Sequence, residues 1–286
     1  MKTFFVFISC ILFTFLFEAC KKLNPDEPIP SYIHIEKISL KTDYQKQGSS
    51  SAKISDAWVY IDEQFIGCFE LPATFPVLYE GTHQIKVRAG IKVNGIAATR
   101  SPYPFYEIFV QKATLKRNER LTLHPVVSYA SFAKFNFMEN FDGVGIILAP
   151  GPAGTADTMK QTFDKKLVFE GTGSGITRLN RNEATFQCIS NTSYVLPAGG
   201  APVFLEFNYK CNHSFLAGIY AHTTSNTTAV PVIGMNPSEN WNKMYVYLTP
   251  TIGGASNATD FNIYFSMFND NSEDLELLID NLKLVY

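Results

Sequence analysis

The sequence has few charged residues and lacks the residue spacings that form common metal sites. Only 17% of its 286 residues are Asp, Glu, Lys or Arg, and the formal net charge is −2. Binding to nucleic acid normally requires a strongly basic surface, so this class of partner is excluded. The five cysteines and five histidines include no Cys-x-x-Cys or His-x-x-x-His pattern, and no zinc-type cofactor is therefore expected.

Motifs for catalysis are also missing. Gly173-Ser174-Gly175 is not a nucleophile elbow, because Thr172 stands where that motif needs glycine. A glycosidase would need two facing carboxylates, and the sequence does not indicate that any two acids face each other. The acids in or near expected strands of the second half are Glu139, Asp142, Glu206 and Asp280. We interpret them as structural acids and expect no enzymatic activity.

The composition that remains favours β-sheets. Hydrophobic residues make up 46% and aromatic residues 14% of the chain, with 18 glycines and 15 prolines for turns. The length is sufficient for two domains of ordinary size. We therefore expect an all-β protein built from two β-sandwich domains.

The first twenty residues indicate a signal peptide. Residues 4–17 are apolar apart from Ser9, Cys10 and Thr14, and Glu18 ends the run before it reaches the length of a membrane-spanning helix. The ending Leu16-Phe17-Glu18-Ala19-Cys20 resembles a bacterial lipobox, which implies acylation of Cys20 and a membrane lipid anchor. A plain secretory signal with an unrelated cysteine is the alternative.

Residues 21–31 form a Pro-rich segment without apolar periodicity, which predicts an extended tether. Lys21 rather than Asp follows the acylated cysteine, and the pair Asp26-Glu27 is a weak version of the acidic export signal of some Bacteroidota lipoproteins. This resemblance implies an outer-membrane location. Either leaflet, periplasmic or cell-surface, is compatible with it.

Residues 32–128 are predicted to form the first sandwich. Residues 58–61 and 65–67 flank Asp62-Glu63, which indicates a β-hairpin. Together with Gly81-Thr82-His83 before an alternating strand, this order resembles the PEGA domain, a small β-sandwich of bacterial envelope proteins. Glu63 stands where that family usually has a turn glycine.

Residues 90–106 are an addition to that pattern and carry three aromatic side chains, Tyr103, Phe105 and Tyr106. One interpretation is a lid over an edge of the sandwich. The other is a docking surface for an outer-membrane or cell-wall protein complex, because aromatic residues on loops are frequent at interfaces. Under the second interpretation the protein is a structural or accessory subunit.

Residues 129–286 are predicted to form the second sandwich. In the segment 203–209, Val203, Leu205, Phe207 and Tyr209 alternate with other residues and therefore share one face of a strand. Glu139-Asn140-Phe141-Asp142-Gly143 at the start and Ile279-Asp280-Asn281-Leu282 at the end resemble jelly-roll domains of Bacteroidota lipoproteins, which are similar in outline to carbohydrate-binding modules. This resemblance implies non-catalytic binding of a glycan or surface polymer.

The same resemblance implies a possible structural calcium ion that ties the first strand of the jelly roll to the last. Glu139, Asp142 and Asp280 are the residues that would supply oxygen ligands. The alternative is that Asp280 caps a turn. No other cofactor is expected.

Aromatic side chains are the candidates for sugar binding, because their faces can stack on sugar rings. The candidate ligand-binding residues are Tyr220, His222, Trp241, Tyr245 and Tyr247. Core or edge packing is the alternative for each of them. Cys188 and Cys211 are either a disulfide between neighbouring strands or two buried thiols.

Overall fold

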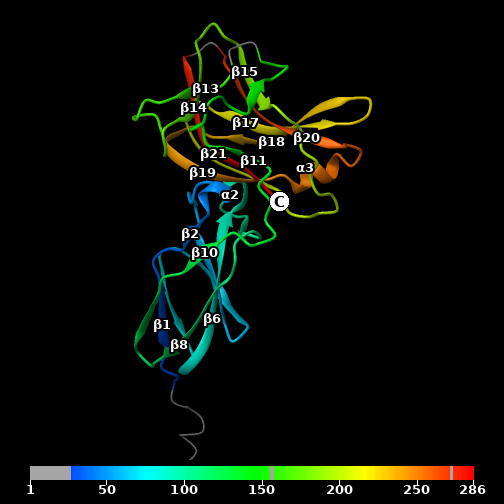
Figure 1. Cartoon of the computed structure of the whole chain (residues 1–286). Helices are drawn as coiled ribbons and strands as arrows, with labels where there is room; N and C mark the ends of the chain where they lie inside the picture. The colour runs from blue at the N-terminus through cyan, green and yellow to red at the C-terminus, as the bar shows by residue number, and fades with distance from the viewer. Residues whose placement is uncertain (1–26, 155–157, 271–272) are drawn as a thin grey trace, which may run out of the picture.

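The computed structural model describes residues 27–154, 158–270 and 273–286, and within them the chain is an all-β protein of two sandwiches (Figure 1). The signal segment, Cys20 and most of the tether lie outside the described residues. The strands up to β10 (Val126–Ser128) pair only with one another, as do those from β11 (Phe137–Glu139) onward. In the described part of the chain, no helix is long and apolar enough to span a bilayer.

One sheet of the first sandwich is short and mixed. It contains β5 (Ala73–Val77), β1 (Ser31–Ile35) and β9 (Arg120–Leu123), in that order. A two-stranded ladder follows it, formed by β2 (Ser39–Lys41) and β10. The short helix α2 (Tyr44–Gln47) follows β2 in the chain.

The facing sheet of the first sandwich is centred on β6 (Gly81–Lys92). Its other strands are β3 (Asp56–Ile61), β4 (Gln64–Glu70), β7 (Arg100–Pro102) and β8 (Phe109–Leu115). Ile33 and Ile35 of the first sheet and Val59 and Val87 of the second belong to one buried cluster. The two sheets therefore share one core.

The predicted hairpin of the first sandwich is confirmed. β3 pairs with β4 in antiparallel register across Asp62-Glu63. Both turn residues have positive φ, 46° and 70°, which is the backbone of a type I′ turn. His83 stabilises Asp62 in this turn, because His83 Nδ1 lies 2.6 Å from Asp62 Oδ2.

The second sandwich packs two larger sheets against each other. The first sheet contains β13 (Lys160–Thr162), β14 (Ser174–Leu179), β21 (Leu275–Val285), β16 (Phe204–Cys211) and β19 (Ser238–Tyr247), with β11 also paired to β21. The second sheet contains β12 (Leu148–Pro150), β15 (Thr185–Ser190), β20 (Asp260–Phe268), β17 (Phe215–His222) and β18 (Thr227–Met235). The helix α3 (Thr249–Gly254) follows β19.

The alternation predicted for β16 is confirmed. Val203, Leu205, Phe207 and Tyr209 all belong to the core of the second sandwich. The intervening Phe204 points to the opposite face of the sheet, yet it is also buried, because it belongs to the core cluster of the first sandwich. The outer face of this sheet is therefore where the two sandwiches meet.

Candidate functional site

Within residues 90–106, residues 90–102 form the end of a β-hairpin that contacts the second sandwich. β6 continues to Lys92, the chain reverses through the short 3-10 turn η1 (Val93–Gly95), and β7 returns along β6. Asn94 and Gly95 have φ values of 56° and 69°. A Cβ atom on Gly95 would lie 3.0 Å from Met244 Cε, so glycine allows the turn to approach β19 of the second sandwich closely.

The aromatic residues that follow this hairpin are buried in the junction. Tyr103, Phe105 and Tyr106 are exposed by only 2%, 1% and 6%. The ring of Tyr103 lies 5.0 Å from Phe204 and 5.2 Å from Tyr245, centroid to centroid. These side chains therefore dock on the chain's own second sandwich and do not form a free surface for another protein, in contrast to the docking hypothesis.

A buried polar cluster lies at the centre of the junction. Glu206 on β16 is fully buried, and its carboxylate accepts hydrogen bonds from Tyr103 Oη at 2.6 Å and from Tyr129 Oη at 2.9 Å. Lys243 Nζ on β19 lies 3.2 Å from Glu206 Oε2. Hydrogen bonds and an opposite charge thus compensate the cost of burying the carboxylate.

Lys283 adds a second buried cation to this cluster. Its ammonium donates to the backbone carbonyl of Ser49 and lies 5.1 Å from the ring centroid of Tyr129. Burial lowers the pKa of Lys283 to about 7, because a charged amine is poorly solvated there. Burial also raises the pKa of the Tyr103 and Tyr129 hydroxyls well above the ordinary value, so both remain hydrogen-bond donors.

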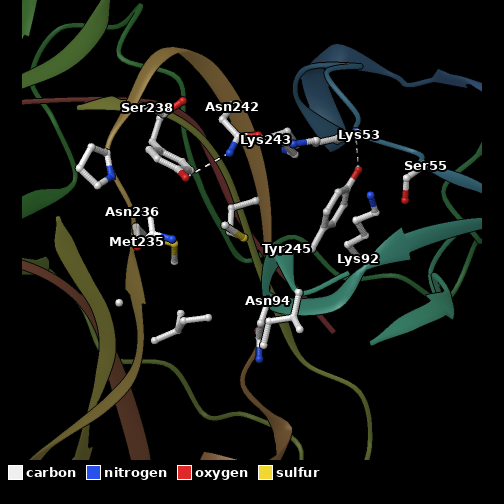
Figure 2. Close-up of a pocket in the computed structure, with 17 residues that line it drawn as sticks. Lys53, Ser55, Lys92, Asn94, Met235, Asn236, Ser238, Asn242, Lys243 and Tyr245 are labelled. Atoms are coloured by element: carbon white, nitrogen blue, oxygen red, sulfur yellow. Dashed lines mark hydrogen bonds between the residues drawn. The ribbon is translucent and has the colours of Figure 1, made fainter. Parts of the chain in front are cut away.

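A cavity of about 490 Å³ opens beside this cluster, between the two sandwiches (Figure 2). The first sandwich supplies one wall, with Lys53, Ser55, Lys92 and Asn94. The second sandwich supplies the other wall from β19 and from the turn between β18 and β19. Its polar residues there are Asn236, Ser238, Asn242, Lys243 and Tyr245.

Hydrogen bonds between the sandwiches hold these walls in place. Lys53 Nζ donates to Asn242 Oδ1 at 2.6 Å, and the Lys53 backbone N–H donates to Tyr245 Oη at 3.1 Å. Figure 2 shows the contact between Lys53 and Tyr245. Within the second sandwich, Asn242 Nδ2 donates to Tyr209 Oη at 3.1 Å. The Tyr247 backbone N–H donates to Asn94 Oδ1 at 2.8 Å. The cavity is therefore a preformed site that exists only when both domains are docked.

The charge in the cavity is cationic. Lys53, Lys92 and Lys243 line it, and none of its lining residues, all within the described chain, is Asp, Glu, His or Cys. Burial and the nearby charge of Lys92 lower the pKa of Lys53. The lining thus offers amides, hydroxyls and ammonium groups, all of which can hydrogen-bond to a polar ligand.

The predicted sugar-binding residues do not lie on one surface. Tyr245 lines the cavity and is 2% exposed. Tyr220 and His222 lie on β17 of the other sheet, where Tyr220 Oη donates to Gln187 Oε1 at 2.8 Å and His222 Nε2 lies 2.6 Å from Asn262 Oδ1. Tyr220 is buried, so it offers no open stacking face.

Trp241 and Tyr247 are on β19 outside the cavity lining. The Trp241 ring lies 5.2 Å from Phe169, and the Tyr247 ring lies 4.9 Å from Phe204. Both rings thus pack against aromatic neighbours within the chain. Of the five residues predicted to bind a ligand, the structure brings only Tyr245 to the cavity.

The three predicted calcium ligands accept hydrogen bonds from different parts of the protein. Glu139 accepts the backbone N–H groups of Phe141 and Ile147, and Asp142 accepts the Thr172 backbone N–H at 2.6 Å. Asp280 is fully buried and accepts from Ser174 Oγ at 2.6 Å. Within the described residues, no three acidic, His or Cys side chains come together as metal ligands.

The cysteines of the second sandwich are free thiols. Cys188 lies on β15 and Cys211 on β16, which belong to opposite sheets. Both are buried. Of the two alternatives stated for this pair, the structure has two buried thiols rather than a disulfide.

The cavity residues Lys53, Asn94 and Asn242 were not identified from the sequence. Lys53 and Asn242 are 189 positions apart, and no local pattern connects them. The dipeptide Asn94-Gly95 was the available signal, because Asn-Gly between apolar stretches favours a tight hairpin turn. This signal locates the hairpin, but it does not identify β19 as the strand against which the hairpin packs.

Comparisons with known proteins give only distant similarities. No protein-family model matches the sequence, and no curated protein matches it. A carbohydrate-binding module of the β-sandwich superfamily covers 92% of this chain and 100% of its own, with 12% identity and a TM-score of 0.41. The CBM22-1 xylan-binding domain from Paenibacillus barcinonensis Xyn10C covers 54% of this chain and 96% of its own, with 10% identity and a TM-score of 0.38.

A family 29 carbohydrate-binding module complexed with mannohexaose covers 54% of this chain and 92% of its own, with 13% identity and a TM-score of 0.35. The identities and TM-scores of all three solved structures are low. What those modules bind therefore carries no argument for this chain. Its function has to be inferred from the cavity.

Proposed function

We propose that this chain is a non-catalytic, lipid-anchored protein of the cell envelope that binds a glycan in the cavity between its two sandwiches. The observation that carries the proposal is the lining of the cavity. Asn94, Asn236 and Asn242 provide amides, and Ser55 and Ser238 provide hydroxyls. These groups donate and accept hydrogen bonds, which matches the mixed donor and acceptor character of sugar hydroxyls.

The size and the apolar part of the cavity agree with a sugar ligand. Its volume of about 490 Å³ falls in the range of roughly 300–1,000 Å³ that is common for small-molecule sites. Ile96 and Ile233 also line it, and Ile96 is exposed, so the cavity provides apolar surface for the C–H face of a pyranose ring. The lining contains no pair of carboxylates for glycoside hydrolysis, so we infer binding without turnover.

Acylation of Cys20 would hold the protein on the outer membrane. Residues 27–30 precede β1 at the end of the first sandwich that points away from the second sandwich (Figure 1). A tether entering there would leave the first, PEGA-like sandwich as a spacer between the membrane and the cavity. The cavity would then lie beyond the first sandwich, at a distance from the membrane where a polymer can reach it.

A steric block tests the glycan site. Asn236 is exposed in the turn between β18 and β19 and lines the cavity. The variant Asn236→Trp should fill the cavity without disturbing the core. Ser225→Trp is the matched control, because Ser225 is exposed in the turn at the opposite end of β18. Binding is measured by a glycan array and by isothermal titration calorimetry with the full chain in mild detergent.

We expect the unaltered chain and Ser225→Trp to bind the same glycan, and Asn236→Trp to lose binding. Equal thermal unfolding temperatures of the two variants would show that the block is local. The proposal is overturned if the unaltered chain binds no glycan, or if Asn236→Trp binds as tightly as Ser225→Trp.

A further inference from the structure

We infer that the cavity selects an acidic oligosaccharide, one that carries carboxylate or sulfate groups on its sugar rings. This inference rests on the proposed function, because it concerns the same cavity and specifies the chemical class of its ligand. It follows from the arrangement of charges in the two walls, which differ in character.

The wall from the first sandwich is cationic. Lys53 and Lys92 both line the cavity. Lys92 Nζ pairs with Glu70 Oε1 at 3.0 Å, and Glu70 lies outside the lining. Lys53 has no ion pair within the described residues, and its ammonium donates instead to the neutral Asn242 amide at 2.6 Å. Lys53 is therefore a cation that faces the cavity without a compensating carboxylate.

Lys243 continues the positive charge on the opposite side. Its ion pair with Glu206 is shared with a second buried amine, since Lys283 is also close enough for the charge of Glu206 to influence it. One carboxylate thus faces two lysines in this cluster. Unlike charges in a partly dehydrated site attract more strongly than in water, so an anionic group in the cavity would be stabilised.

The wall from the second sandwich is suited to the uncharged hydroxyl groups of the sugar. Asn236, Ser238 and Asn242 are neutral hydrogen-bonding groups. A ring that presents its acidic substituent to Lys53 and Lys92 would turn its hydroxyl groups toward these residues. A neutral sugar would satisfy only the second wall and would leave Lys53 without a counter-charge.

The charge of Lys92 near Lys53 supports the same conclusion. Burial and the charge of Lys92 both lower the pKa of Lys53, so the surroundings of Lys53 disfavour the charged amine. A bound carboxylate or sulfate would reverse this effect. Binding of an acidic glycan should therefore be coupled to the charge of Lys53 and should weaken as salt screens the interaction.

The test compares three oligosaccharides of equal length by calorimetry on the full chain in mild detergent. These are an oligogalacturonate, which carries carboxylate but no sulfate, a carrageenan oligosaccharide, which carries sulfate but no carboxylate, and a neutral cello-oligosaccharide. We expect at least one acidic glycan to bind about tenfold or more tightly than the neutral one, equivalent to about 1.4 kcal/mol. The better acidic ligand distinguishes carboxylate from sulfate. Its affinity should fall between about 50 mM and about 500 mM salt.

Variants of Lys53 assign the effect to this site. Lys53→Met should reduce affinity for the acidic glycan about tenfold more than it reduces affinity for the neutral glycan. Lys53→Arg should restore binding, because it keeps the charge. The matched control is Lys112→Met, since Lys112 is exposed on β8 and lies outside the cavity.

The outcomes separate this inference from the proposed function. If a neutral glycan binds as tightly as the acidic ones and Asn236→Trp blocks it, the cavity is a glycan site and the selectivity inferred here is wrong. Unchanged affinity of Lys53→Met for the acidic glycan would also overturn it. If neither acidic nor neutral glycans bind, the proposed function itself fails and this inference fails with it.

Discussion

Tyr103 of the first sandwich donates a 2.6 Å hydrogen bond to Glu206 of the second, and both side chains are buried. The bond joins residues 103 positions apart and lies beside the ion pair between Glu206 and Lys243. A buried carboxylate that holds donors from both domains makes their relative position specific. Because the cavity walls come from both domains, this junction also determines the shape of the cavity.

Replacing Glu206 by Gln should strongly destabilise the protein. The change removes the ion-pair partner of Lys243 and the larger of the two carboxylate charges that favour the charged form of Lys283. Breaking a buried ion pair by removing one partner costs about 3–5 kcal/mol. Urea denaturation of Glu206→Gln should show a loss of that size in the free energy of unfolding.

The matched control for Glu206→Gln is Glu119→Gln. Glu119 pairs with Lys116 at 3.4 Å, but both side chains are more than half exposed. An exposed pair contributes about 0–1 kcal/mol, so this variant should unfold almost like the unaltered protein. Equal unfolding free energies for the two variants would show that the buried cluster does not stabilise the junction.

Lys283 should make stability rise with pH above neutrality. Burial lowers its pKa to about 7 in the folded state from an ordinary value of 10.5. Between these two values the unfolded chain binds one more proton than the folded chain, so each added pH unit stabilises the fold by up to about 1.4 kcal/mol. Below about pH 7 the amine is charged in both states, so stability no longer changes with pH through Lys283 and the cost of burying its charge is fully present.

The measurement is the free energy of unfolding across the range from about pH 7 to about pH 9. The charges that act on Lys283 are those of Glu206, Lys243 and Glu170, and they are kept constant by changing Lys283 alone. Lys283→Met should lose the rise with pH, whereas Lys112→Met should keep it. Parallel profiles for Lys283→Met and the unaltered chain would contradict the prediction.

Local sequence patterns were sufficient to predict the β-sheets, but they did not predict what packs on the outer face of the sheet that contains β16. The alternation in residues 203–209 identified the core face of β16 correctly. Alternation states which residues share a face, but it does not state what packs on the other face. Glu206 therefore had the pattern of an outward-facing strand acid, and the burial of Tyr245 beneath the first sandwich had no local signal.

Position in a strand also misled the assignment of acids. Asp280 was considered as a calcium ligand or a turn cap, yet it lies inside β21 and is fully buried. Burial raises its pKa to about 7, although Ser174 donates a hydrogen bond to it. Its environment depends on β14, more than a hundred positions earlier in the chain, and sequence periodicity contains no information about that neighbour.

The three described cysteines should differ in reactivity with maleimide. Cys68 is exposed, whereas Cys188 and Cys211 are buried. Burial raises the pKa of Cys188 to about 12, so both access and thiolate content are low there. Mass mapping of labelled peptides should find Cys68 modified in the native protein, and Cys188 and Cys211 only after unfolding. Rapid native labelling of Cys188 would contradict the described packing.

Cys20 should be the site at which the protein is attached to the membrane. Cys20 ends a segment that resembles a lipobox, and the predicted membrane anchor depends on this one cysteine. Cys20→Ser should abolish acylation and reduce the amount of protein recovered in the membrane fraction. Cys10→Ser is the matched control, because Cys10 lies within the apolar segment that cleavage would remove.

The intact mass of the mature protein should correspond to a chain that begins at residue 20 with a diacylated cysteine. A mature chain without lipid, or cleaved at another residue, would support the alternative of a plain secretory signal. The cavity between the sandwiches would then be carried by a secreted protein, and the glycan-binding tests on that cavity would retain their meaning.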